Sequence, residues 1–425
     1  MIQKLKGTYD VYGSLAKKQD YVKKLFQVVC ENYNYSYIET PLIERSELFH
    51  RGVGETTDIV TKETYDFVDR GGRNNTLRPE GTAGIARAYV EDKMYALPII
   101  ENKLYNTLPL KLWYMGSMFR YERPQKGRYR ELRQMGIESY GSNDPIMDAE
   151  VISLGINFLK ELGLDVIVKI NSIGGTETRN KYREALINHF EKHIDEFCDD
   201  CKERLYKNPL RILDCKVDSD NELLKGAPSI LDYLNDEEKE NFDKIKEYLD
   251  YLEVEYEVDS SLVRGLDYYT NVVFEFVTKN NNFGSIGGGG RYNNLLKSLD
   301  GPDIPAVGFA FGFDRIIAEI TENEIELNID DSIDAYILTI TEKENFYALE
   351  LAQKLRMCGY KVDLDLSGKN MKAKFKESDR YKSKYTIIVG EEEELTDTLT
   401  VKDNLTKEEK KIELDNLIDY LDTNI

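Results

Sequence analysis

The stretch Phe119–Glu138, FRYERPQKGRYRELRQMGIE, constrains the fold and the function of this chain more than any other segment. Apolar and aromatic flanks, LKLWYMGSMFRY before it and RELRQMGIESYG after it, predict two strands joined by a charged turn region. Six basic side chains crowd into that region: Arg120, Arg123, Lys126, Arg128, Arg130 and Arg133. Arginine forks match phosphate oxygens in pairs, so the pattern indicates a site for a nucleoside triphosphate or an RNA end. A solvated surface loop is the alternative.

Composition limits the classes of function. The chain has 425 residues, which predicts two to four domains, and a net charge of -21. That charge argues against non-specific adhesion to nucleic acid or membranes, although a local basic patch can still bind RNA. The start, MIQKLKGTYD, has no apolar signal region, and no apolar run approaches the length of a membrane span. We therefore expect a cytoplasmic protein.

The order of predicted elements separates three regions. Residues 1–325 contain amphipathic helical patterns and segments that predict strands, such as DVIVKIN, NVVFEFVT and PAVGFAFG. Residues 181–256 are charged and helical, with Phe242, Ile245, Leu249 and Leu252 on one face, and resemble an inserted module. Residues 331–425 alternate strand and helix, which predicts a small α/β domain with a largely parallel sheet.

The last region carries a second basic stretch. A partner long enough to touch both basic stretches would be RNA rather than a free nucleotide, although a solvated helix face explains the second one equally well. Its cations are Lys369, Lys372, Lys374, Lys376, Arg380, Lys382 and Lys384.

Five cysteines do not form a disulfide framework in a chain of this length. Cys198, Cys201 and Cys215, with His189 and His193 upstream, could supply ligands for Zn²⁺. A second CxxC is missing, so reduced cysteines in a helical segment are the default interpretation and no metal ligand is assigned.

Four segments in this order resemble class II histidyl-tRNA synthetases: TLRPEGTAG (residues 76–84), the basic loop, LVRGLDYYTNVVFEF (262–276) and GFAFGFDR (308–315). The resemblance runs from Lys6 to the C-terminus. It implies an α+β catalytic core of antiparallel sheet flanked by helices, with a helical insertion and a C-terminal α/β anticodon-binding domain. It also implies a homodimer formed through the segment around Pro41.

The implied activity has two steps. Histidine and ATP give histidyl-adenylate and pyrophosphate, and histidine then passes to the 3' end of tRNA(His). Negative charge develops on the α-phosphate during attack, so fixed cations aimed there stabilise the transition state. By resemblance, Arg120 and Arg264 are those catalytic cations, and Arg128, Arg315 and Glu122 complete the ATP site. Mg²⁺ is expected with the ATP phosphates rather than in a protein cage.

Further roles follow from the same resemblance. Glu138 and Tyr269 match the pair that reads the imidazole. The remaining histidine-binding positions are Glu80, Gly81, Thr82, Gln134, Tyr268 and Tyr292, and Arg123 and Gln125 match positions that face the tRNA acceptor end. For the tyrosines, ordinary core packing is the alternative. Two departures from the family pattern are Asn293–Asn294 after Tyr292, and Asp314 where Glu is commoner; we expect the latter to matter less than loss of Arg315.

Two non-enzymatic alternatives share this fold: a regulatory subunit of ATP phosphoribosyltransferase and a sensor of uncharged tRNA. The regulatory relatives typically lack the anticodon domain and have a damaged RGLDYY segment, whereas this chain has both. The sequence therefore favours an aminoacyl-tRNA ligase.

Overall fold

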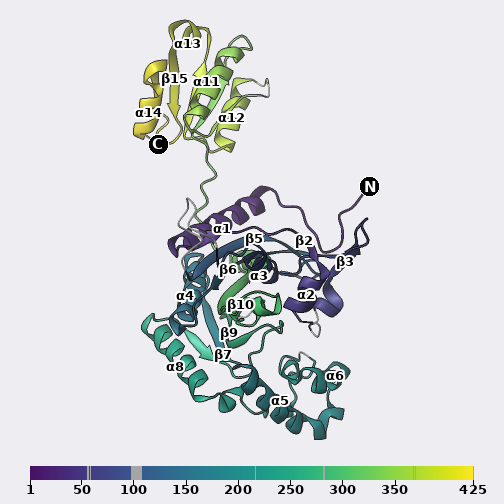
Figure 1. Cartoon of the computed structure of the whole chain (residues 1–425). Coiled ribbons are helices and arrows are strands. Elements are labelled where there is room, and N and C mark those ends of the chain that lie inside the picture. Colours follow the sequence, from purple (N-terminus) through teal and green to yellow (C-terminus); the bar gives the residue numbers. More distant parts are fainter. Residues whose placement is uncertain are drawn as a thin grey trace. The chain divides into compact units, whose positions relative to one another are not determined.

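The computed structural model describes residues 1–54, 57, 59–96, 108–215, 217–280, 283–366, 368 and 370–424. Lys369, from the second basic stretch, lies outside these residues. The chain forms two compact units, Met1–Leu327 and Asn328–Ile425 (Figure 1). Among the described residues, none of the helices is long and apolar enough to cross a membrane.

An eight-stranded sheet forms the centre of the first unit, in the order β1-β5-β6-β11-β10-β9-β7-β8. Every neighbouring pair from β5 to β7 is antiparallel, and the edge strands β1 and β8 pair in parallel. The predicted antiparallel core, and the hairpin around the basic loop, are therefore confirmed. The strands are β1 Ser36–Tyr37, β5 Leu110–Phe119, β6 Glu131–Tyr140, β7 Val166–Ser172, β8 Tyr256–Val258, β9 Thr270–Thr278, β10 Ser285–Arg291 and β11 Ala306–Gly312.

Helices with apolar stripes cover one face of this sheet. Val22 and Phe26 of α1 (Gly13–Asn32) and Phe158 of α4 (Pro145–Glu161) are fully buried, as helical spacing predicts. They join a core cluster with residues of α8 (Asp236–Tyr251) and α10 (Phe313–Glu322), and α4 and α8 lie side by side in Figure 1. Met135 and Ile137 of β6 point into this cluster.

The opposite face of the sheet carries the polar residues. Successive side chains of a strand point to opposite faces, so Gln134, Gly136, Glu138 and Tyr140 of β6 share the face away from Ile137. A second apolar cluster lies there, contributed partly by α3 (Thr82–Glu91). Short elements complete the unit: α2 Ser46–Gly52, η1 Ile59–Glu63, α9 Leu295–Ser298, and a small sheet of β2 Ile43–Arg45, β4 Asn74–Leu77 and β3 Tyr65–Val68.

A helical segment connects β7 to β8, and its described residues form no strand. It begins at α5 (Thr176–Phe190) and ends with α8. Between these lie η2 Glu191–Glu196, α6 Asp199–Lys207, η3 Pro209–Ile212, α7 Glu222–Lys225 and η4 Ile230–Tyr233. Leu186, Phe190 and Leu205 are buried and belong to the second apolar cluster.

The second unit is a five-stranded sheet in the order β13-β12-β14-β15-β16. β13 (Val362–Leu364), β12 (Ala335–Thr339) and β14 (Tyr385–Val389) are parallel, but β15 (Thr398–Asp403) and β16 (Glu409–Glu413) continue the sheet in antiparallel pairing. The expectation of a largely parallel sheet missed this hairpin, because β16 is charged and mostly exposed. The helices are α11 Asn345–Met357, α12 Met371–Arg380, α13 Glu391–Thr396, η5 Leu414–Asn416 and α14 Leu417–Asn424.

The second basic stretch is not a uniform cationic face. Lys374 is buried, pairs with Asp365 at 2.8 Å and donates to the Thr339 carbonyl oxygen at 2.8 Å. Lys382 and Lys384 also form ion pairs with carboxylates of this unit. These three lysines therefore stabilise the unit itself.

Candidate active site

Glu80 lies between β4 and α3 and closes the N-terminal end of α3. Its carboxylate accepts the backbone N–H groups of Thr82 and Ala83 at 2.8 and 2.7 Å. A carboxylate is favourable there because the first amides of a helix lack internal partners. Burial raises the pKa of Glu80, while these backbone hydrogen bonds and the charge of Arg120 oppose the rise. Glu80 is therefore a buried acid held in a fixed position at the start of α3.

Glu138 is the second buried acid and is 1% exposed. The Thr82 hydroxyl donates to it at 2.7 Å, and so does the hydroxyl of Tyr292. Burial raises the pKa of Glu138 to about 8; the charge of Glu80 adds to the rise, and the two hydroxyl hydrogen bonds oppose it. Gly308 is paired with Glu138 across β11 and β6, and a Cβ at Gly308 would collide with the carboxylate. The glycine is thus required for the position of Glu138.

Tyrosine rings form the walls around these acids. Tyr268 and Tyr269 have ring centres 4.7 Å apart, and Tyr268 and Tyr292 have theirs 5.6 Å apart. The structure thus brings the three predicted tyrosines together with Thr82 and Glu138. Asn293, one of the departures from the family pattern, directly follows Tyr292. Asn293 accepts the Ala306 N–H at 3.1 Å while Ala306 accepts the Tyr292 N–H at 2.9 Å, so the asparagine holds the turn.

Among the described residues of the site, three have a buried polar atom with no hydrogen-bond partner: the side-chain oxygen of Gln134, the hydroxyl of Tyr114 and Nε of Arg264. Leaving such an atom unpaired costs about 1–3 kcal/mol, so this arrangement suits a polar ligand. The sequence analysis missed Tyr114. It is on β5, two residues after Leu112, which pairs with Glu138, so strand alternation alone would have placed it on the same face.

Two arginines lie next to the acids. Arg120 follows β5 and donates from Nε to the carbonyl oxygen of Pro79 at 2.8 Å, directly beside Glu80 in sequence. Arg264 precedes β9, donates to the carboxylate of Glu275, and has its guanidinium 5.8 Å from the ring centre of Tyr269. A Cβ at Gly288 would lie 2.8 Å from the Arg264 guanidinium, so the glycine-rich β10 leaves room for it.

Arg315 and Arg128 extend the cationic group. Burial, together with the positive charges of Arg128 and Arg120, lowers the pKa of Arg315 to about 10. Arg128 is only loosely compensated, by Glu122 at 3.7 Å. An open pocket adjoins these arginines, lined by Gln125, Lys126, Arg128, Phe283, Arg315 and Glu322. Because the arginines repel one another, bound polyanion would stabilise the arrangement.

The other cations of the basic loop have different partners. Arg133 donates its backbone N–H to Asp314 at 2.8 Å, and its guanidinium lies 5.0 Å from the ring centre of Tyr9. Arg130 lies 3.9 Å from the ring centre of Tyr121, and Lys126 pairs with Glu322. The cations of the loop therefore divide into those that lie beside the arginine group and could bind phosphate, and those that contact other side chains of the unit. Arg123 and Gln125 are exposed at the loop tip.

Asp314, one of the two departures from the family pattern, holds three segments of the first unit together. It is 5% exposed and accepts from the Tyr9 hydroxyl as well as from Arg133. Its carboxylate thereby ties the N-terminal segment and β6 to the start of α10. Arg315, the next residue of α10, donates to the carbonyl oxygen of Ser285, which orients its guanidinium.

The three cysteines are free thiols in a helical segment, as the default interpretation expects, but the two histidines considered with them have other partners. His189 hydrogen-bonds the Leu223 carbonyl oxygen at 2.8 Å, and His193 pairs with Glu196 at 3.0 Å. Neither histidine joins the three cysteines, which gather with Asp218 instead.

Comparison with known proteins gives a consistent result over the whole chain. The family profile described as histidyl-tRNA synthetase matches residues 7–316, and the one described as anticodon binding domain matches residues 334–424. Proteins named histidine–tRNA ligase from Bacillus licheniformis and Bacillus subtilis are each 47% identical over 423 residues, 99% of this chain and 98% of theirs. The crystal structure of apo S. aureus histidyl-tRNA synthetase superposes with a TM-score of 0.82, at 38% identity, covering 99% of this chain and 100% of that one.

Proposed function

The chain belongs to the histidyl-tRNA synthetase family, and from this premise we propose how its residues carry out the reaction. The protein is an aminoacyl-tRNA ligase that charges tRNA with histidine. The regulatory and sensor alternatives are not favoured, because the full-length relatives are named as ligases and the anticodon-binding region is present.

One observation carries the assignment of the site: the two buried acids, Glu80 and Glu138, adjoin the group of arginines, and the two sets meet at Glu80 and Arg120. Activation joins an amino-acid carboxylate to the α-phosphate of ATP, so the amino acid and the triphosphate must lie side by side. Arg120 is bound to the Pro79 carbonyl oxygen and is electrostatically coupled to Glu80 on one side and Arg315 on the other. The histidine pocket is thus proposed on the Glu80 side and the ATP site on the Arg315 side.

In the first step, a histidine carboxylate oxygen attacks the α-phosphorus of ATP, a new P–O bond forms, and the bond to pyrophosphate breaks. Arg120 and Arg264 would stabilise the charge that develops on the α-phosphate. Arg128 and Arg315 would hold the β- and γ-phosphates, with Glu122 orienting Arg128. Since Arg264 is anchored by Glu275 and its space is provided by Gly288, it is held in place before substrate arrives.

Selection of histidine requires partners for two ring nitrogens and for the α-ammonium group. We assign the imidazole to Glu138 and Tyr269, and the ammonium group to Glu80, Thr82 and Gln134. The unpaired Gln134 oxygen supports this assignment, as does the position of Thr82 between the two acids. A pocket that pairs with these groups rejects analogues lacking them by about 10⁴ or more.

In the second step, histidine moves from the adenylate to the terminal ribose of tRNA, and AMP leaves. Arg123 and Gln125 are exposed at the loop tip, which suits contacts to a single-stranded acceptor end. The region matched as an anticodon binding domain would hold the other end of the same tRNA.

Mg²⁺ would enter with ATP and neutralise charge on the departing pyrophosphate. The acids near the arginine group, Glu122 and Glu275, are paired with Arg128 and Arg264. This pairing fits an ion held mainly through phosphate oxygens and water, as is usual for Mg²⁺ at nucleotide sites.

A two-fold homodimer and a cytoplasmic location belong to the same proposal. Leu42 and Ile43, next to Pro41, are 44% and 51% exposed, and Tyr37 nearby is 50% exposed. Exposed apolar residues of this kind suit a self-complementary interface. The cytoplasmic location follows from the use of the product in protein synthesis.

The decisive experiment is ATP–pyrophosphate exchange with each amino acid in turn. We expect exchange that depends on L-histidine alone. Folded protein that supports no exchange, or that responds equally to another amino acid, would contradict the proposed site.

A further inference from the structure

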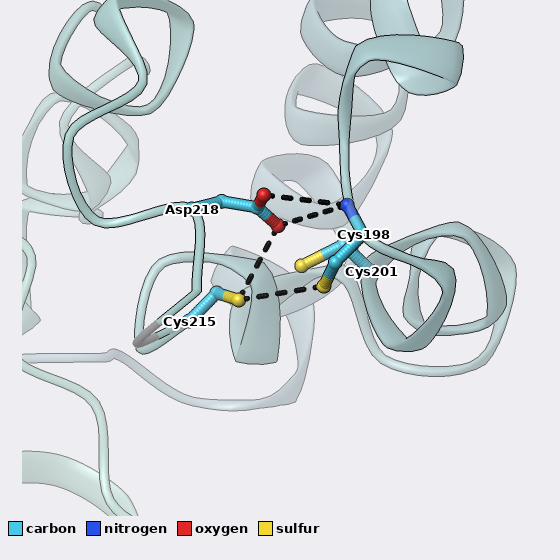
Figure 2. A group of neighbouring side chains, drawn as sticks. All are labelled: Cys198, Cys201, Cys215 and Asp218. Atoms are coloured by element: carbon cyan, nitrogen blue, oxygen red, sulfur yellow. Dashed lines mark hydrogen bonds between the residues drawn. The ribbon is translucent and has the colours of Figure 1, made fainter.

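Three thiols and one carboxylate converge in the helical segment between β7 and β8. The Sγ atoms of Cys198, Cys201 and Cys215 and a carboxylate oxygen of Asp218 all lie within 4.8 Å of one another (Figure 2). Within the part of the chain that the structure describes, this is the one group of three or more such residues suited to a metal ion. It plays no part in the site proposed above.

The spacing explains how the group forms. Cys198 is the N-cap of α6 and Cys201 lies in its first turn, so both side chains point to the same side of the helix start. Cys215 and Asp218 repeat the same two-residue spacing after η3. The sequence has no second CxxC, and the structure shows Asp218 in the place of its second cysteine.

Hydrogen bonds join three of the four donor residues. The Cys198 backbone N–H donates to both oxygens of Asp218, at 3.3 and 3.1 Å, and the Cys215 thiol donates to Asp218 at 3.3 Å. Cys201 and Cys215 are buried, whereas Cys198 and Asp218 are partly accessible. An ion could therefore enter the group from solvent past Cys198 and Asp218, while Cys201 and Cys215 lie on its buried side.

We propose that Cys198, Cys201, Cys215 and Asp218 form a structural site for one Zn²⁺ ion. Thiolates with one carboxylate suit Zn²⁺, and four protein donors leave no open position, as is typical of structural rather than catalytic zinc. Three thiolates and a carboxylate carry the same total charge as the four thiolates of common zinc sites. Binding releases the thiol protons to solvent, and the N-terminal end of α6 favours the resulting negative charge.

A disulfide is the main competing use of these cysteines. The Sγ atoms of Cys198 and Cys215 are 3.7 Å apart, which is a contact between thiols and not a bond. A disulfide would use two of the sulfurs and would give no reason for the third thiol or for Asp218 to face them. A metal ion uses all four groups.

The position of the site suggests what the ion would stabilise. The residues between the two donor pairs include Asn208, which donates to Asp267 at 3.2 Å, and Arg211, which donates to the Gly265 carbonyl oxygen at 3.2 Å. These contacts reach the loop that carries Arg264. The zinc site would thus hold the helical segment in the shape that supports this loop.

The test is metal content and affinity of the full chain, prepared reduced, stripped with a chelator and offered equimolar Zn²⁺. We expect about one zinc per chain after gel filtration, with a rise in melting temperature. Cys215→Ser and Asp218→Ala should lower the affinity in a chelator competition about tenfold or more. Cys358→Ser, which changes an exposed cysteine of the second unit, should match the unchanged chain.

Co²⁺ in place of Zn²⁺ gives a readout that needs no variant. A tetrahedral spectrum with thiolate charge-transfer bands is expected from the unchanged chain, and it serves even if Cys215→Ser fails to fold. The proposal is overturned if the reduced chain retains no zinc, if Co²⁺ shows no thiolate bands, or if folded Cys215→Ser binds zinc as tightly as the unchanged chain. Formation of a Cys198–Cys215 disulfide that Zn²⁺ does not prevent would also overturn it.

Discussion

Glu138 couples histidine binding to pH. Burial raises its pKa to about 8, so in the free protein this acid is largely protonated at pH 7. An ionised carboxylate accepts an imidazole N–H more strongly than the neutral acid does, so histidine binding below pH 8 favours release of a proton. We expect the KM for histidine in pyrophosphate exchange to fall about tenfold between pH 7 and pH 9, levelling off above the pKa.

Glu138→Gln separates this effect from titration of histidine itself. The variant should bind histidine more weakly at every pH, and the ratio of its KM to that of the unchanged protein should rise from pH 7 to pH 9. Titration of the ligand is common to both proteins and cancels in that ratio. A ratio that is independent of pH would show that Glu138 is not the group responsible.

Arg264→Ala tests transition-state stabilisation. Because Arg264 is proposed to act on charge that develops during attack, its loss should lower kcat for exchange by about 10²–10³, with little change in the KM for histidine. Loss of Arg264 also leaves Glu275 without this partner. Arg264→Ala with Glu275→Gln is the matched control, because it removes the unpaired charge and should restore stability but not kcat. A rise in histidine KM alone would contradict the assigned role.

Residue identities were predictable mainly where a motif specifies them. Glu80, Glu138 and the arginines come from motifs, and the structure brings them into two adjoining groups. Tyr114 and Asp218 have no motif. Tyr114 could have been found from strand alternation, whereas Asp218 could not, because an aspartate in a charged helical segment resembles the many solvated ones around it.

At the level of elements, β10 is fixed to α4 by a buried ion pair. Arg291 and Asp148 are 3% and 0% exposed and meet at 3.0 and 2.5 Å. Arg291 also donates to the carbonyl oxygens of Ser142 and Asp144 just before α4. Asp148→Ala would leave a buried guanidinium uncompensated, so we expect a loss of about 3–5 kcal/mol in the free energy of unfolding.

Denaturant unfolding of Asp148→Ala should be compared with Asp303→Ala. The latter breaks an exposed pair with Lys297 at 3.2 Å, and its expected cost is below about 1 kcal/mol. Equal small losses in both variants would mean that the buried pair does not hold the start of α4 to β10.

Element prediction succeeded where periodicity was strong. The apolar stripe of α1 and the apolar and aromatic residues of β5 and β6 predicted these elements correctly, because burial of one face fixes the spacing of apolar residues along the sequence. The hairpin β15–β16 was missed, since only Leu399 and Val401 in β15 are buried and β16 shows no apolar alternation. Its pairing depends on backbone hydrogen bonds with β14, which leave no trace in composition.

At the level of the whole molecule, each unit has its own apolar core. One cluster, including Ile337, Leu351 and Leu399, lies wholly in residues 328–425, and the other three lie wholly in residues 1–327. The helices and strands that build these clusters can be recognised from the apolar patterns of the sequence. The packing that brings residues 76–84, 119–138, 262–276 and 308–315 together is non-local, and only the family resemblance anticipated it.

Separate cores make a truncation informative. Residues 1–327 retain every proposed contact to histidine and ATP, so this fragment should fold and support pyrophosphate exchange within about twofold of the full chain. Charging of tRNA should fall by on the order of 10², because two linked contacts to one RNA bind far more tightly than either alone. The measurement is exchange and aminoacylation on the same preparation. Equal loss of both activities would indicate that the second unit stabilises the first rather than binding tRNA.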